Sequence, residues 1–201
     1  MIQNDCPICH GRGIDPNTGQ KCKCILENAL IHFLPTNMRN IKIASDRKIN
    51  SSWSEYNQLV ITEPSNYPFI NFLKHYLILK YLQDYTYKYH IMTGKDVFDV
   101  YMDSSIEAQS ALVNDDLLVL NLGNDVKNKY MQELIPFLIK ERNTKGLRTY
   151  VNIMNKGLYK NQEDKMYKMI LDKYGEETKE VITNPEFKFK KVTPYYLKKG
   201  E

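Results

Sequence analysis

The sequence predicts an α/β protein: a small amino-terminal module built around four cysteines, followed by a domain with a mainly parallel β-sheet. All four cysteines of the chain lie between residues 6 and 24. Beyond residue 58, strand-like apolar segments alternate with helical ones, which is the pattern of a parallel sheet covered by helices. Hydrophobic residues make up 42% of the chain and charged residues 26%, a composition that supports a buried core.

The first cysteine pair, Cys6 and Cys9, has the Cys-x-x-Cys spacing, which directs two sulfurs at one metal ion. Gly11 and Gly13 let the backbone fold back beside that pair, because glycine adopts a positive φ without steric cost. Residues 15–19 (Asp-Pro-Asn-Thr-Gly) then supply a turn. We therefore expect a hairpin that returns the chain toward the first pair.

The second pair, Cys22 and Cys24, is separated by one residue rather than two, which departs from a plain zinc ribbon. Four thiolates still complete a tetrahedral zinc site, and a site closed by four protein ligands supports folding rather than chemistry. Two disulfides are the competing interpretation. Because nothing before Cys6 resembles a signal peptide, we expect a cytoplasmic, reducing location and structural zinc. His10 could replace one sulfur, although a solvent-facing loop position suits it better.

The module is predicted to continue into a helix over residues 25–33, which Leu34-Pro35 ends. Residues 34–57 are polar and poorly periodic and are interpreted as a linker. The α/β domain is then expected over residues 58–201, with the zinc module and its helix occupying 1–33. A chain of 201 residues is long enough for one domain and a small appended module.

The core of the domain is predicted from apolar periodicity. Residues 117–122 (Leu-Leu-Val-Leu-Asn-Leu) form an apolar run, as in a central strand buried on both faces. Pro136 lies inside the helix predicted from Lys127 to Arg142 and should kink or break it. The other predicted strands are 58–62, 88–92, 148–154 and 187–192, and the other predicted helices are 69–85, a segment starting at 94, and 163–174.

The formal net charge is +4, and lysines are interleaved with acids over most of the chain, which is typical of a solvated surface. Basic residues are denser around the cysteines and near the carboxyl end, where they alternate with aromatic residues. Lysines beside aromatic rings can follow a phosphate backbone and stack bases; the plain interpretation is an edge strand with a solubilising terminus. The candidate nucleic-acid contacts are Arg12, Lys21, Lys23, Lys188, Lys190 and Lys191. No apolar run approaches the about 20 residues that cross a bilayer, so no membrane partner is expected.

In this order, the segments resemble the replicative-helicase loaders of the DnaC/DnaI type, which are AAA+ proteins with an amino-terminal zinc module. The likeness of the module rests on the two cysteine pairs with their glycines and on residues 34–39 (Leu-Pro-Thr-Asn-Met-Arg). In the domain, residues 59–65 correspond to the strand before the phosphate loop, 116–123 to the Walker B strand and 149–155 to the sensor strand. The likeness spans roughly residues 5–160 and implies an AAA+-like, P-loop NTPase-like sheet.

The phosphate loop departs from the family pattern. Nucleotide binding there requires Gly-x-x-x-x-Gly-Lys-Ser/Thr, whose amides and lysine hold the phosphates. The corresponding residues 63–70 contain no glycine and no lysine, and Pro64 and Pro68 each remove an amide donor. Ser65 and Asn66 are left at the degenerate position, so we expect ATP binding to be lost.

The Walker B position departs as well. Acidic residues at the end of this strand hold magnesium and activate water in the family, whereas Asn121 and Leu122 stand there in this chain. Asp115 and Asp116 lie at the other end of the strand, where a helix-to-strand turn is expected. Asn155 stands at the sensor position. These losses predict a degenerate AAA+-like domain without catalytic activity.

The resemblance implies a phage DNA replication accessory protein that acts as an inactive scaffold, contacting the replicative helicase or a loader subunit and holding single-stranded DNA, alone or as an oligomer. One alternative is a divergent active ATPase loader, in which Arg142 and Arg148 act on a neighbour's nucleotide rather than lie as surface charges. Another is a DnaJ-like zinc protein that binds nucleic acid or a partner protein, although the His-Pro-Asp tripeptide of a J domain is absent. Trp53 and Tyr56 are either contact anchors or packed against their own domain.

Overall fold

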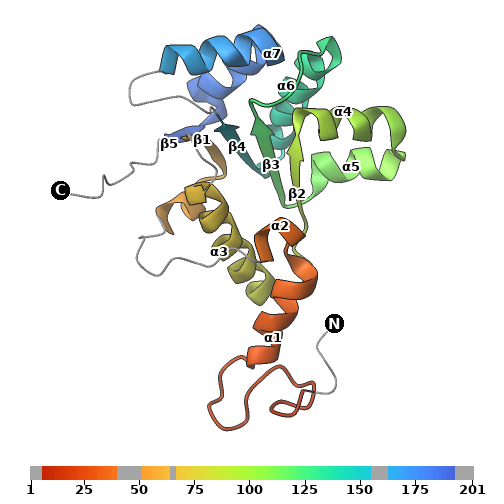
Figure 1. Ribbon diagram of the computed structural model, residues 1–201, viewed down its shortest axis with the longest axis vertical. Coiled ribbons are helices and arrows are strands. Elements are labelled where there is room, and N and C mark those ends of the chain that lie inside the picture. The colour runs from red at the N-terminus through yellow and green to blue at the C-terminus, as the bar shows by residue number, and fades with distance from the viewer. Residues whose placement is uncertain (1–5, 40–50, 64–66, 155–162, 193–201) are drawn as a thin grey trace, which may run out of the picture. The chain divides into compact units, whose positions relative to one another are not determined.

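The computed structural model describes residues 6–39, 51–63, 67–154 and 163–192 (Figure 1). The chain divides into two compact units. One comprises residues 1–50 and 70–87 and is called the cysteine unit here; the other comprises residues 51–69 and 88–201 and is called the sheet unit. None of the helices in the described ranges is both long enough and apolar enough to cross a membrane.

The cysteine unit is helical beyond its cysteines. Helix α1 (Lys23–Asn28) continues into the π-helical turn η1 (Ala29–Phe33), and together they confirm the helix predicted over residues 25–33. The short helix α2 (Thr36–Arg39) follows the expected break at Leu34-Pro35. The long helix α3 (Tyr67–Gln83) supplies this unit with residues 70–83 and is continuous in the chain with the last residues of the sheet unit's first segment.

The sheet unit contains a parallel sheet, as the sequence predicts. Its strands in the described part of the chain are β1 (Gln58–Glu63), β2 (Tyr89–Thr93), β3 (Leu117–Leu122), β4 (Arg148–Met154) and β5 (Lys190–Val192). Their order is β2-β3-β4-β1-β5, and every neighbouring pair is parallel. The carboxyl ends of all these strands therefore meet at one edge of the sheet, which is where open parallel sheets bind ligands.

Four helices cover one face of this sheet. They are α4 (Gly94–Asp103), α5 (Ile106–Asn114), α6 (Lys129–Thr144) and α7 (Glu163–Thr183), and two short turns, η2 (Ser51–Glu55) and η3 (Pro185–Phe187), precede β1 and β5. Alternate residues of β3, Leu118, Leu120 and Leu122, belong to one buried cluster with side chains of all four helices, such as Ile135 and Ile170. Side chains alternate between the two faces of a strand, and the intervening Leu117 and Val119 are also fully buried. The strand 117–122 is thus buried on both faces, as expected.

Of the kink or break predicted at Pro136, the break does not occur. Helix α6 runs from Lys129 to Thr144 without interruption. Proline removes only one amide donor, and the residues on both sides of Pro136 are anchored in the buried cluster through Ile135 and Leu138. Packing of this apolar face holds the helix together across the missing hydrogen bond.

Two other elements extend or shorten the predicted ones. The predicted helix 163–174 ends where Gly175 adopts a non-helical conformation with φ 83° and ψ 167°, but α7 resumes beyond it to Thr183. Helix α5 was not predicted from the sequence. The last strand is shorter than the predicted 187–192, because η3 occupies its beginning.

Candidate metal centre

Directly after Cys9, the chain folds back on itself through two residues with positive φ. The amide of His10 donates to the carbonyl oxygen of Cys6 at 2.8 Å, and the amide of Arg12 donates to that of Cys9 at 2.9 Å. His10 has φ 48° and Gly11 has φ 80°. Glycine adopts this conformation without a Cβ clash, which explains its place two residues after Cys9.

A short hairpin returns the second pair to the first, as predicted. Ile14 and Lys21 form an antiparallel bridge, and the amide of Cys22 donates to the carbonyl oxygen of Gly13 at 2.8 Å. At the tip, Gly19 has φ 66° and donates its amide to the carbonyl oxygen of Asp15. Cys22 thus ends the hairpin immediately before α1 begins, and Cys24 lies in the first turn of that helix.

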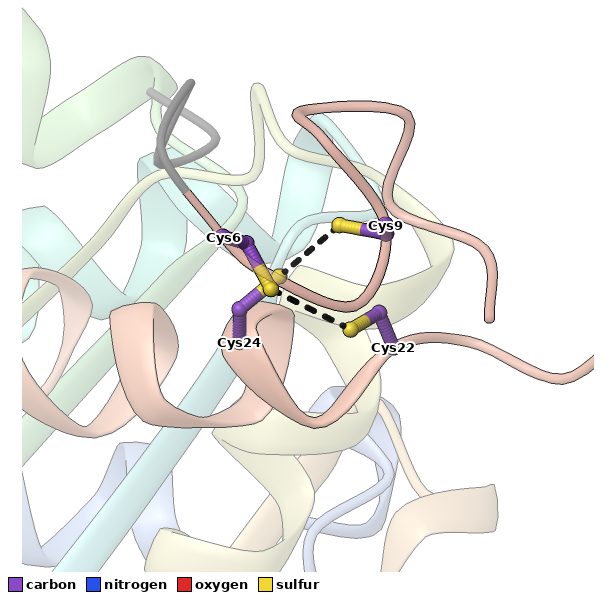
Figure 2. Close-up of side chains that lie close together, drawn as sticks. All are labelled: Cys6, Cys9, Cys22 and Cys24. Atoms are coloured by element: carbon purple, nitrogen blue, oxygen red, sulfur yellow. Dashed lines mark hydrogen bonds between the residues drawn. The ribbon is translucent and has the colours of Figure 1, made fainter. Parts of the chain in front are cut away.

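The four sulfurs form one cluster (Figure 2). Their Sγ atoms all lie within 4.8 Å of one another, with 3.4 Å between Cys9 and Cys24 and 3.7 Å between Cys6 and Cys22. A tetrahedral zinc ion with bonds of about 2.3 Å places its sulfurs about 3.8 Å apart. All four side chains are buried and none forms a disulfide. The cluster can therefore hold a metal ion, and its donors and spacing fit zinc.

The thiols differ in acidity. Burial acts to raise the pKa of Cys9, but hydrogen bonds from the other thiols and from the backbone of Gly13 outweigh it and lower the pKa to about 7. For Cys24, burial and the neighbouring sulfurs raise the pKa. One thiolate among four close sulfurs disfavours the next, because like charges repel. A bound divalent cation would remove this conflict, since it stabilises every thiolate at once.

The cluster rests on α3. The cysteines share a buried group with Ile25, Ala29 and Tyr81. The side-chain amide of Asn28 donates to the hydroxyl of Tyr81 at 2.9 Å, and the ring of Phe33 lies 4.8 Å from that of Tyr81. Residues from both segments of the cysteine unit therefore enclose the candidate metal centre.

The residues around the cysteines are placed as follows. His10 is exposed and is not part of the sulfur cluster. Among the basic residues predicted as nucleic-acid contacts, Arg12 is exposed, while Lys21 donates from Nζ to the carbonyl oxygen of Leu82. Lys23 lies 4.0 Å from the carboxylate of Glu27 on an exposed helix surface. Of the three, Lys21 is the one already engaged by the protein's own backbone.

At the carboxyl edge of the sheet, neutral side chains stand where the sequence resemblance implies a Walker B position. Asn152 of β4 donates from Nδ2 to Oδ1 of Asn121, its register partner on β3, at 3.0 Å. Leu122 is fully buried in the helix-covered core. Asp115 and Asp116 lie in the turn between α5 and β3, as predicted. Ser65, Asn66 and Asn155 lie outside the described residues.

Asp125 is a buried acid near this edge that the sequence analysis missed. Its carboxylate accepts hydrogen bonds from the amides of Gly94 and Lys95 at 3.2 and 3.0 Å and from the hydroxyl of Tyr174. Burial and the hydrogen bond to Asp125 raise the pKa of Tyr174. Asp125 therefore caps the amino end of α4 and fastens it to α7. Its trace in the sequence is an aspartate within the loop between β3 and α6, which is too common a feature to interpret.

Arg142 and Arg148 both donate hydrogen bonds to groups of the sheet unit itself. Arg142 is fully buried, and its guanidinium donates to the carbonyl oxygens of Leu112 and Arg148, both at 2.7 Å, and to the hydroxyl of Thr149 at 3.2 Å. Arg148 donates to the carbonyl oxygen of Ser54 at 2.6 Å. For Arg142, both alternatives considered from the sequence are wrong, because its guanidinium is buried and hydrogen-bonded inside the sheet unit. Arg148 is half-buried, and its action on a neighbour's nucleotide stays a prediction.

The carboxyl-terminal basic segment is described as far as Val192. Lys188, Lys190 and Lys191 are exposed, whereas Phe187 and Phe189 are half-buried against the helix-covered core. The Nζ of Lys190 lies 5.8 Å from the ring centre of Tyr56, and that of Lys191 lies 5.1 Å from that of Tyr167. Trp53 is buried, which favours packing against its own domain over a contact anchor.

Comparison with known proteins places the fold. No family model matches the chain, and no curated protein matches it. Among solved structures, the crystal structure of the DnaC helicase loader is similar, with a TM-score of 0.54 and 15% sequence identity, over 87% of this chain and 100% of that chain. At this identity the likeness concerns the fold. The chain thus has a loader-like α/β fold, with a four-cysteine cluster at its amino end.

Proposed function

We propose that the chain is a helicase-loader-like accessory protein of DNA replication, encoded by a phage, which acts through protein contacts without hydrolysing ATP. The observation that carries this proposal is the combination of a DnaC-like parallel sheet with a preceding four-cysteine cluster. Neither feature alone specifies a function, since one fold hosts many activities. Their occurrence in one chain favours a loader-like role over an isolated zinc-binding protein.

The inactive role is supported by the carboxyl edge of the sheet. An active site of this class needs a carboxylate at the end of β3 to hold magnesium. Asn121 has no negative charge and already pairs with Asn152, while the aliphatic side chain of Leu122 is buried. The loop sequence at residues 63–70 lacks the lysine that pairs with phosphate. ATP therefore plays no part in the proposed mechanism.

In this proposal the cysteine unit holds a structural zinc ion through Cys6, Cys9, Cys22 and Cys24 and contacts the replicative helicase or a loader subunit. Four thiolate ligands leave no position for a substrate, so the metal stabilises the contact surface. Exposed apolar side chains lie on this unit, including Ile8, Ile14 and Ile31. Exposed apolar groups of this kind are suited to a protein partner.

Two measurements on the zinc-loaded protein test this function. The first is capture by an immobilised bacterial replicative helicase hexamer, comparing the wild type with Ile14→Asp and with Ile106→Asp, an exposed residue of the sheet unit, as the matched control. We expect capture that Ile14→Asp weakens and Ile106→Asp leaves unchanged. Absence of capture by helicases of several hosts would contradict the loader-like role.

The second measurement is titration with a fluorescent ATP analogue in the presence and absence of magnesium. We expect no saturable binding up to millimolar concentration. Saturable, magnesium-dependent binding would refute the inactive role and favour the divergent ATPase. Because helicase capture and nucleotide binding are separate measurements, the failure of one leaves the other interpretable.

A further inference from the structure

A cavity lies at the edge of the sheet opposite the expected nucleotide edge. It has a volume of about 310 Å³, at the lower end of the range of about 300–1,000 Å³ for small-molecule sites. It lies beside the amino ends of β1 and β4 and includes Lys188, two residues before β5. Its lining residues are Glu55, Tyr56, Asn57, Gln58, Asn143, Gly146 and Lys188.

Most of the polar groups that line this cavity are unpaired. Among the described residues, no hydrogen bond or ion pair engages the side chains of Asn57, Asn143 and Lys188. Gln58 is buried and donates from Nε2 to the carbonyl oxygen of Leu147 at 2.8 Å, which identifies the other end of the amide as the oxygen. That Oε1 is buried and has no partner within the described ranges. Buried polar atoms are rarely left unsatisfied, so a ligand or an ordered water is expected at this end of the sheet.

An aromatic ring and positive charge complete the cavity. Tyr56 lines it, and the Nζ of Lys190 lies 5.8 Å from the centre of the Tyr56 ring. Lys188 lines the cavity itself and is exposed. Since β5 pairs with β1 in register, with Lys190 opposite Leu59, the sheet holds these lysines close to the cavity. Amides, a ring and ammonium groups are thus gathered in one place.

We propose that this cavity binds a base of single-stranded nucleic acid. A base would stack on Tyr56, and its polar edge would hydrogen-bond to the amides of Asn57 and Asn143, which can both donate and accept. Lys188 and Lys190 would meet the adjoining phosphates. The inference rests on the proposed function, because it gives a loader-like accessory protein of DNA replication a site for the single-stranded DNA that the sequence resemblance leads us to expect.

The chemistry favours nucleic acid over other ligands. A free phosphate would use the lysines alone and leave Tyr56 and the amides without a role. An acidic peptide offers carboxylates but no planar face with a donor and acceptor edge. The cavity also contains Glu55, which disfavours a bare anion and is compatible with a base that carries an exocyclic amine.

Two oligonucleotides distinguish stacking from charge. One is a fluorescein-labelled twelve-nucleotide oligodeoxycytidylate, whose bases carry the exocyclic amine, within the site sizes of about 4–16 nucleotides of single-strand binders. The other has the same backbone without bases. In fluorescence anisotropy titrations of the full, zinc-loaded chain, the base-containing strand should bind more tightly. Tyr56→Leu should weaken its binding by about tenfold and hardly change binding of the abasic strand, while Tyr56→Phe should bind as the wild type does.

Matched variants test the placement of the site. Tyr167→Leu is the control for Tyr56→Leu. The Tyr167 ring also has a lysine, Lys191, over it, but it does not line the cavity. Lys188→Ala should weaken the binding of both oligonucleotides more than Lys129→Ala does. Lys129→Ala removes an equal charge from an exposed position on α6. Asn143→Ala should weaken the base-containing strand selectively, and it provides the test if Tyr56→Leu does not fold by circular dichroism.

The outcomes separate the cavity from the wider function. Equal binding of both oligonucleotides by the wild type would overturn the proposal that the cavity binds a base, while leaving a DNA contact by charge. Equal losses of affinity in Tyr56→Leu and Tyr167→Leu would do the same. Binding of neither oligonucleotide would overturn the cavity and the DNA contact together. Helicase capture, measured separately, decides the loader-like role in every case.

Discussion

At the residue scale, the clustering of the cysteines could be predicted from the local sequence, whereas the contacts of Arg142 could not. All four cysteines of the candidate metal centre were found from the sequence, because such a cluster has a local signature, a spacing of one or two residues around turns. The role of Arg142 on α6 depends instead on three acceptors that all lie on other elements, Leu112 on α5 and Arg148 and Thr149 on β4. No local sequence pattern indicates such a contact, so a buried arginine cannot be distinguished from a surface arginine before the fold is known.

Replacing Arg142 by methionine should destabilise the sheet unit by about 3 kcal/mol or more. Methionine keeps much of the volume but leaves buried acceptors without donors, each at a cost of about 1–3 kcal/mol. The measurement is the urea midpoint of unfolding followed by circular dichroism. Lys145→Ala, an exposed change near the end of the same helix, should stay within about 0.5 kcal/mol of the wild type. Equal midpoints for Arg142→Met and the wild type would contradict the structural role.

At the scale of elements, periodicity located strands and helices but not their interruptions. Pro136 has a strong intrinsic tendency to break helices, and burial of its neighbours overrides it in α6. Gly175 interrupts α7, where the predicted helix 163–174 also ended. The helix resumes because Val181 and Ile182 reach the same core. Tertiary packing thus decides where helices continue, and the residues that provide this packing lie outside the short segment from which a helix is predicted.

Gly175 offers a test at this scale. An alanine there would combine a positive φ of 83° with a Cβ placed 3.2 Å from Cβ of Gln132 on α6. Gly146 has a similar φ of 68°, but nothing lies within 4 Å of its would-be Cβ. Strain alone costs roughly 1–2 kcal/mol, and crowding adds to it. We expect Gly175→Ala to lower the midpoint of thermal unfolding more than Gly146→Ala does. Equal decreases would mean that α6 shifts to accommodate the added Cβ.

At the scale of the whole molecule, the alternation of strands and helices predicted the parallel sheet, because that signal is repeated along the chain. The predicted boundaries of a module at 1–33, a linker at 34–57 and a domain at 58–201 remain a prediction. Residues 70–87 belong to the cysteine unit, and their sequence could not show it, since an apolar helix after a strand suits a sheet equally well. Contacts between distant segments are absent from local patterns.

Metal removal should distinguish the two units. Structural zinc supplies about 10–16 kcal/mol of apparent binding free energy in small zinc-binding peptides, so a strong chelator should unfold the cysteine unit. Hydrogen exchange followed by mass spectrometry should then show lost protection in residues 6–39 and 70–87, with β3 and β4 still protected. Added zinc should restore the original pattern. Unchanged exchange in the cysteine segment would mean that packing, and not metal, holds it.

Because the cysteine unit is built from two separate stretches of the chain, it cannot be transferred to another protein as one continuous segment of the gene without the residues between them. Its two stretches, 1–50 and 70–87, are interrupted in the chain by β1. A deletion or fusion that transfers only the first stretch carries all four cysteines but leaves behind Tyr81, on which the cluster rests. The unit is therefore not a cassette that recombination at one junction could move between proteins. It is inherited together with the first strand of the sheet.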